Sequence, residues 1–226
     1  MHAFGVRRQT SRPSDEMIAI IDSGIANLRS VEKGFARAGF EAQVVEDPRT
    51  LREARGIVLP GVGAFAEGIA KLRAAGFDEA LLREIERGKP LLGICLGLHF
   101  LFSESEEFGT HRGLDVLKGK VVRFPAGLCG DAGPLKVPHM GWNALAIRRP
   151  APIFRDLPAE PAVYFVHSYY VEPADAAVVA ATTEHGVPFT SAIWRDNIMA
   201  TQFHPEKSQR VGLAMLRNFG ELCRSW

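Results

Sequence analysis

The sequence predicts an α/β protein whose core is an open, mostly parallel twisted sheet flanked by helices, with extra antiparallel strands in its second half. Two observations support this prediction. In the first half of the chain, short apolar runs typical of buried strands alternate with stretches of helical periodicity. In the second half, strand-like runs follow one another between proline, glycine and aspartate turns. At 226 residues the chain can bury the core of one sizeable domain, which we expect over residues 17–226.

The first half is predicted to consist of strands and helices in alternation. Residues 17–22 are expected to form the first strand, and residues 26–38 a helix that ends at Gly39, a residue suited to the turn after a helix. The next segments are a strand at 41–46, a short helix at 49–55, a strand at 57–59, two helical stretches between 65 and 87, a strand leading to Cys95 and a helical stretch at 98–102. This alternation predicts parallel strands with helices on both faces.

The second half is predicted to be richer in β-structure. Its strands are expected at 121–124, 143–148, 163–171, 178–183, 190–194 and 198–203. A final helix is expected at about 208–222.

The composition argues against several classes of protein. A net charge of +1 does not indicate bulk nucleic-acid or membrane binding, and no apolar run approaches transmembrane length. Three cysteines without a secretory hydrophobic segment indicate a cytoplasmic protein in a reducing environment. Residues 1–16 contain several Arg and Ser residues and lack apolar patterning. We expect them to form a disordered N-terminal extension, with an early start codon or a transit peptide as alternatives.

Cys95 lies in the run Gly93-Ile94-Cys95-Leu96-Gly97, between an apolar strand and a helical stretch. A tight strand-to-helix turn leaves little room for Cβ atoms, and glycines on both sides satisfy that requirement. At the start of a helix, backbone N–H groups favour a thiolate. The pattern therefore predicts a cysteine nucleophile, and the competing interpretation is a small buried structural cysteine.

A base for this nucleophile is predicted near the C-terminus, in Phe203-His204-Pro205-Glu206. Pro205 favours an extended conformation for His204, and residues two apart in an extended chain point to the same face. His204 can then face the thiol while Glu206 fixes its tautomer. We therefore expect a Cys95–His204–Glu206 triad; an ordinary strand-end histidine is the alternative.

The loop Pro60-Gly61-Val62-Gly63 follows a predicted strand and is the candidate oxyanion site. Such a loop can direct the N–H groups of Val62 and Gly63 at one point, and the elbow geometry adds the N–H of Leu96. The spacing Gly61-x-Gly63-x-x-Ala66 also matches a dinucleotide fingerprint. That alternative is disfavoured, because the spacing lies outside the first strand–helix unit and the downstream acidic residues fall in a helical pattern.

These motifs resemble those of the class I, triad-type glutamine amidotransferases. Within this family the chain is similar to the glutaminase subunits of imidazole glycerol phosphate synthases. The strings that carry this similarity are Val137-Pro138-His139-Met140-Gly141-Trp142-Asn143 and Phe165-Val166-His167-Ser168-Tyr169-Tyr170. The resemblance covers the chain from about residue 17 to its end and implies a flavodoxin-like fold.

The resemblance implies a reaction, a partner and no cofactor. Cys95 would attack the side-chain amide of glutamine, His204 would pass a proton to the leaving ammonia, and a thioester would then be hydrolysed. The ammonia would travel through a tunnel to a separate (β/α)₈-barrel synthase subunit. That partner would make imidazole glycerol phosphate and an aminoimidazole carboxamide ribotide in histidine biosynthesis.

The resemblance also implies residues that hold glutamine. They are Gly61, His99, Glu107 and the stretch His167, Ser168 and Tyr169. His99 is a departure, since the family usually has glutamine there. A neutral imidazole can still donate and accept, but only in fixed directions.

Several alternatives to this interpretation remain open. His139 and His167 raise the possibility of a metal, but no ligand spacing supports one, and we expect none. His139 is expected to shape the ammonia exit and His167 to support the glutamine pocket, or both simply satisfy backbone groups. The chain could also serve a different amidotransferase, be a non-catalytic interaction subunit that binds glutamine poorly, or be a papain-like hydrolase.

Overall fold

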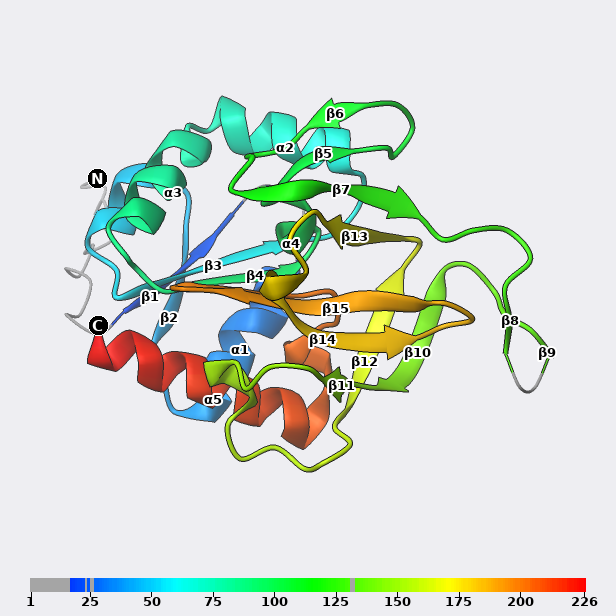
Figure 1. The fold of residues 1–226 in the computed structure, drawn as a ribbon. Helices are drawn as coiled ribbons and strands as arrows, with labels where there is room; N and C mark the ends of the chain where they lie inside the picture. Colours follow the sequence, from blue (N-terminus) through cyan, green and yellow to red (C-terminus); the bar gives the residue numbers. More distant parts are fainter. Residues whose placement is uncertain (1–16, 23, 25–26, 131–132) are drawn as a thin grey trace, which may run out of the picture.

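The computed structural model describes residues 17–22, 24, 27–130 and 133–226. The expected N-terminal extension at residues 1–16 lies outside the described residues. A large mixed sheet runs through the centre of the molecule, with helices above and below it (Figure 1). This architecture agrees with the predicted α/β fold.

Five neighbouring strands form the parallel part of the sheet, in the order β2–β1–β3–β4–β16. They are β1 (Ile18–Ile21), β2 (Ala42–Val45), β3 (Gly56–Gly61), β4 (Leu91–Cys95) and β16 (Ile198–Thr201). The register pairs Gly61 with Cys95 and Thr201 with Ile94. Because parallel strands end at the same edge, the loops after β3, β4 and β16 meet there.

Helices cover both faces of these strands (Figure 1). α1 (Leu28–Ala38) and α5 (Gln209–Ser225) lie on one face, and α2 (Phe65–Ala74) and α3 (Phe77–Glu86) lie on the other. Alternation along β1 sends Ile20 toward the α1/α5 core and Ile21 toward the α2/α3 core. None of the described helices combines the length and apolarity needed to span a membrane.

The remaining strands extend the sheet mainly by antiparallel pairing, in the order β16–β15–β13–β7–β5–β6. They are β5 (Phe102–Ser105), β6 (His111–Arg112), β7 (Leu117–Arg123), β13 (Tyr169–Pro173), β14 (Val179–Glu184) and β15 (Pro188–Arg195), with β11 (Ala146–Ile147) pairing on β14. Separate two-stranded sheets are formed by β10 (His139–Ala144) with β12 (Ala162–His167), and by β8 (Cys129–Gly130) with β9 (Gly133–Pro134). The second half of the chain is therefore rich in antiparallel strands, as the sequence predicts.

Several elements differ from their predicted bounds, and three of these differences change how a segment pairs or folds. The strand expected at 163–171 is interrupted at Ser168, so β12 pairs with β10 while β13 joins the main sheet. The strand expected at 143–148 begins at His139 and is divided into β10 and β11. The helical stretch expected at 98–102 is α4 (Leu96–Phe100), and Phe102 already begins β5. Residue patterning alone does not reveal such a change of pairing partner, because every segment remains extended.

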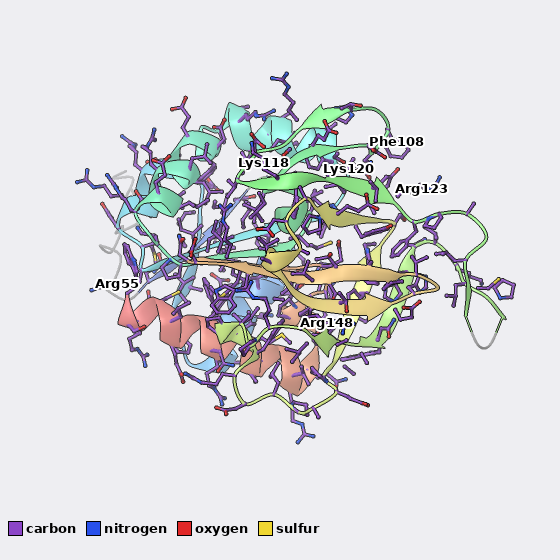
Figure 2. All side chains as sticks on the ribbon, in the orientation of Figure 1. Arg55, Phe108, Lys118, Lys120, Arg123 and Arg148 are labelled. Carbon is purple, nitrogen blue, oxygen red and sulfur yellow. The ribbon has the colours of Figure 1, made fainter. Side chains whose placement is uncertain are left out.

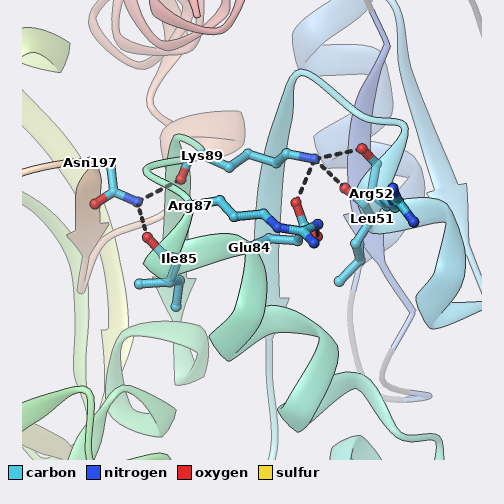
Figure 3. A network of polar contacts seen from close by, with 7 residues as sticks. All are labelled: Leu51, Arg52, Glu84, Ile85, Arg87, Lys89 and Asn197. Carbon is cyan, nitrogen blue, oxygen red and sulfur yellow. Dashed lines mark hydrogen bonds and ion pairs between the residues drawn. The ribbon is translucent and has the colours of Figure 1, made fainter.

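A buried lysine secures the start of β4 (Figure 3). Lys89 Nζ pairs with Glu84 at 2.9 Å and donates to the carbonyl oxygens of Leu51 and Arg52. Asn197 donates to the Lys89 carbonyl oxygen at 2.8 Å, which links β4 to the turn before β16. Burial lowers the pKa of Lys89, against the opposing effect of Glu84. These bonds hold in place the strand that carries Cys95.

Candidate active site

Cys95 occupies the sharp turn between β4 and α4 in a strained conformation, with φ 54° and ψ −108°. A Cβ atom added at Gly97 would lie 1.8 Å from the carbonyl oxygen of Leu59, and one at Gly93 would lie 2.9 Å from the Ala200 Cβ. Both flanking glycines are therefore required by close packing. The positive φ that the turn needs falls on the cysteine itself.

His204 and Glu206 lie just beyond β16, at the same edge of the sheet. His204 Nδ1 lies 2.8 Å from Glu206 Oε1, and both side chains are almost fully buried. His204 is extended, with φ −102° and ψ 99°, as its position before Pro205 predicts. Its backbone is fixed by a bond from its N–H to the Tyr164 carbonyl oxygen at 3.0 Å. Nδ1 thus donates to the carboxylate, which leaves Nε2 directed away from Glu206.

The free imidazole nitrogen is available to the cysteine. His204 Nε2 is buried and has no hydrogen-bond partner among the described residues, while His204 and Cys95 line the same cavity. Burial would lower the pKa of His204, but the Cys95 sulfur and the Glu206 carboxylate outweigh it and raise this pKa to about 10. The site therefore favours an imidazolium between two groups that can carry negative charge.

A cavity of about 420 Å³ opens in front of Cys95. It is lined by Val62, Gly63, Cys95, Leu96, His99, Glu107, Phe108, Arg123, Val166, His167, Ser168, Tyr169 and His204. Its volume and its mixture of apolar and polar walls are typical of small-molecule sites. The lining contains all the predicted site residues except two: Glu206, which lies behind His204, and Gly61.

Gly61 borders a second, much smaller cavity of about 10 Å³, which it shares with His204 and Glu206. Its Cβ position is closed by the Leu96 side chain, 2.9 Å away. The next glycine differs: Gly63 has φ 90° and open space around its Cβ position, so backbone conformation alone requires it.

His99 does not point freely into the cavity but is bonded to Gln202. Its Nε2 lies 2.8 Å from Gln202 Oε1, and Gln202 Nε2 lies 3.9 Å from Cys95 Sγ. Burial lowers the pKa of His99 to about 4, against the Gln202 hydrogen bond, so the ring is neutral and donates through Nε2. The hydrogen bond from His99 holds the Gln202 Oε1 atom, so the NH₂ group of the same amide is oriented toward Cys95 Sγ.

Sequence reasoning missed Gln202, although a signal was present. Gln202 lies two residues before His204, in the same run that carries the predicted base, and an extended chain with that spacing would place both side chains on one face. Phe108, Arg123 and Val166 were also missed, and only the folding of β7, β12 and the turn after β5 onto the pocket reveals them.

Glu107 also lines the cavity. Its Oε2 accepts the backbone N–H of Phe65 at 2.6 Å, at the start of α2, and its own N–H donates to Ser105 Oγ. A carboxylate at a helix N-terminus is favoured electrostatically. Oε1 has no hydrogen-bond partner among the described residues and remains available to a ligand.

A chain of neutral side chains leads from the cavity to β10. His167 Nδ1 donates to the Tyr169 carbonyl oxygen at 2.9 Å, so its Nε2 must accept from His139 Nδ1 at 3.0 Å. His139 Nε2 in turn accepts from the Asn143 amide at 3.2 Å. Burial sets the pKa of His167 well below its usual value and lowers that of His139 to about 4, with His185 contributing. Each ring therefore has a fixed tautomer.

The other cysteines lie apart from this site, and no metal cluster is visible in the described part of the chain. Cys129 is exposed, and burial raises the pKa of the Cys223 thiol above its usual range. No group of three or more His, Cys, Asp or Glu side chains among the described residues could hold a metal ion.

Comparison with known proteins identifies the family. The chain is 59% identical to the imidazole glycerol phosphate synthase subunit HisH of Syntrophotalea carbinolica, over 91% of this chain and 100% of that protein. It is 56% identical to the HisH subunit of Geobacter sulfurreducens, over 91% of this chain and 98% of that protein.

Solved structures support the same fold. PurLQS from Thermotoga maritima matches with a TM-score of 0.69 and 16% identity, over 92% of this chain and 97% of that one. The glutaminase domain of Trypanosoma brucei CTPS matches with a TM-score of 0.59 and 17% identity, over 91% and 94% of the two chains. Residues 19–222 match the family described as glutamine amidotransferase class-I. This chain therefore belongs to the class-I glutamine amidotransferase family.

Proposed function

We propose that this chain is the glutaminase subunit of an imidazole glycerol phosphate synthase and acts in histidine biosynthesis. The relatives that carry this name are 59% and 56% identical to it over almost their whole length. The observation that carries the catalytic part of the proposal is the buried 2.8 Å contact between His204 and Glu206 beside the elbow cysteine.

The reaction begins with attack of the Cys95 thiolate on the side-chain amide carbon of glutamine. His204, charged and held by Glu206, gives its Nε2 proton to the amide nitrogen, so ammonia leaves and a γ-glutamyl thioester remains. Neutral His204 then takes a proton from water as the water attacks the thioester. The C–S bond breaks, glutamate leaves and the imidazolium–thiolate pair is restored.

Negative charge develops on the amide oxygen in both steps. The N–H of Leu96, directly after the nucleophile, is one proposed donor, and the loop carrying Val62 and Gly63 supplies the other. We propose that the Val62 N–H turns inward only when the synthase partner binds its ribotide. Gly63, with φ 90° and an unobstructed Cβ position, gives the loop the freedom to turn.

Glutamine is proposed to lie between Glu107 and the strand end that carries His167, Ser168 and Tyr169. Glu107 Oε1 is uncommitted among the described residues and suits the substrate ammonium group. His99 contributes through the cavity wall, and Gly61 supports the loop from behind. Neutral His167 fixes the backbone at Tyr169 through its 2.9 Å bond.

Ammonia is proposed to pass to a separate (β/α)₈-barrel synthase subunit, in the cytoplasm. The exposed apolar side chains of β10, Met140 and Trp142, are 63% and 49% accessible and suit a covered interface. The hydrogen bond between His139 of β10 and His167 connects this strand to the cavity, so a partner docked on β10 could influence the glutamine site.

The test is ammonia release from glutamine by this chain alone, and by its mixture with the barrel subunit and ribotide. Turnover that appears only in the full mixture supports both the assignment and the gated loop. Robust turnover without a partner would overturn the gating. No turnover in any mixture would overturn the proposed synthase assignment.

A further inference from the structure

The glutamine cavity holds charges of both signs outside the triad. Among the lining residues, Glu107 is the carboxylate and Arg123 is the permanent cation; His99 and His167 are neutral because burial lowers their pKa values. An α-amino acid is a zwitterion, with an ammonium and a carboxylate on the same carbon. A site with one anionic and one cationic side chain at its mouth binds such a zwitterion more tightly than a ligand that lacks one of the two charges.

Arg123 is positioned by sheet register. It ends β7 and lies directly opposite Tyr169 of β13 in an antiparallel pair. Opposite residues in such a pair project from the same face with Cβ atoms about 5 Å apart. Because Tyr169 also lines the cavity, this register directs the Arg123 side chain toward the cavity mouth.

Arg123 is not engaged elsewhere in the described structure. Figure 2 labels the other two cations of the same strand, Lys118 and Lys120. Lys118 is paired with Asp115, and Lys120 is paired with Glu106. Arg123 is exposed and has no ion-pair partner among the described residues. A guanidinium without a partner at the rim of a cavity can form a bidentate pair with a carboxylate.

An aromatic residue completes the mouth. Phe108 is 87% exposed and has a positive φ of 53°. Its ring lies edge-on to the ring of Tyr169, with the two ring centroids 6.5 Å apart. A bulky residue rarely adopts a positive φ, and Phe108 lines the same cavity as Arg123. The ring can cover the α-carbon of a bound amino acid and shield the Arg123–carboxylate pair from water.

We propose that Arg123 binds the α-carboxylate of the substrate and so selects a free α-amino acid over a peptide-bound or amidated glutamine. This inference rests on the proposed glutaminase function. Arg123 is then a specificity-determining residue, while Glu107 binds the ammonium group of the same substrate.

The test is protection of Cys95 from alkylation by iodoacetamide, read from its peptide by mass spectrometry. Exposed Cys129 is the internal control for reagent strength. The protecting ligands are L-glutamine and L-glutamine α-amide, which lacks the carboxylate charge. The variants are Arg123→Gln, the charge-keeping Arg123→Lys, and Lys118→Gln, which removes a cation from the other end of β7.

For the unaltered chain and Lys118→Gln, we expect glutamine to protect at a concentration about tenfold lower than its α-amide. Arg123→Gln should lose this preference, because the protecting concentration of glutamine should rise roughly tenfold while that of the α-amide stays the same. Arg123→Lys should restore part of the preference. An unchanged preference in Arg123→Gln would overturn the inference and leave the glutaminase function standing. No protection of the unaltered chain by glutamine would overturn the function and this inference together.

Discussion

His99 Nε2 lies 2.8 Å from Gln202 Oε1, and the Gln202 amide nitrogen lies 3.9 Å from Cys95 Sγ. This arrangement gives the departure at position 99 a physical consequence. A neutral imidazole with its proton on Nε2 is a one-way donor, so it fixes which end of the Gln202 amide faces sulfur. His99 therefore orients the amide that faces Cys95 Sγ as well as lining the cavity.

Gln202→Leu should therefore lower kcat for glutamine hydrolysis about tenfold while leaving KM nearly unchanged. The variant loses the hydrogen bond from the Gln202 amide to the Cys95 sulfur. A tenfold fall in kcat corresponds to an activation free energy higher by about 1.4 kcal/mol. Steady-state kinetics with the synthase partner measures this effect. His99→Gln is the matched control, because an amide at position 99 can still donate to Gln202. Equal kcat values for Gln202→Leu and the unaltered chain would refute the support role.

Cys95→Ala should abolish glutamine hydrolysis, by at least about a thousandfold, because no other side chain can form the thioester. The same variant mixed with the barrel subunit should still allow synthesis from added ammonium salt. Glutamate release measures glutamine hydrolysis, and formation of the imidazole product measures the ammonia-dependent synthesis. Loss of the ammonia-dependent reaction would argue against the division of labour between two chains.

The stability of the protein should decline as the pH falls from about 6.5 to about 4. In this window the unfolded chain protonates its histidines, whereas His99 and His139 remain neutral because their folded pKa values are about 4. Unfolding then takes up protons, and each such group contributes a slope of up to about 1.4 kcal/mol per pH unit. This stability is fully present above the unfolded pKa.

Urea denaturation at pH 7, 6 and 5 measures this decline. His139→Gln should flatten it, since the variant has one buried neutral histidine fewer. His111→Gln, on the edge strand β6, serves as the control. A pH dependence identical in the unaltered chain and His139→Gln would contradict the expectation.

Lys89→Met should destabilise the protein by about 3–5 kcal/mol, because Glu84 and two backbone carbonyls lose their buried partner (Figure 3). Arg87→Met removes the other cation beside Glu84, but Arg87 is 51% exposed. Its loss should therefore change stability by less than about 1 kcal/mol. Chemical denaturation compares the two variants, and equal losses would show that burial is not the deciding factor.

Features that depend on a few neighbouring residues could be predicted from the sequence. The alternating first half predicted the parallel strands β1 to β4, and the glycines around Cys95 predicted the elbow. Pro205 predicted the extended backbone of His204, whereas Glu206 reaches His204 from the short 3₁₀ helix Pro205–Lys207 and not from an extended chain. These signals work because a few neighbouring residues contain all the geometry they need.

The surroundings of the Cys95 turn depend on contacts between segments that are distant in the chain. Gln202 reaches Cys95 across 107 positions, and Arg123 reaches the cavity because β7 pairs with β13. The break at Ser168 separates two sheets within one continuous strand-like run, which periodicity cannot reveal. Side-chain patterns record whether a residue is buried, but the identity of its neighbour depends on which strands pair and in which register, and that is fixed only when the whole sheet assembles.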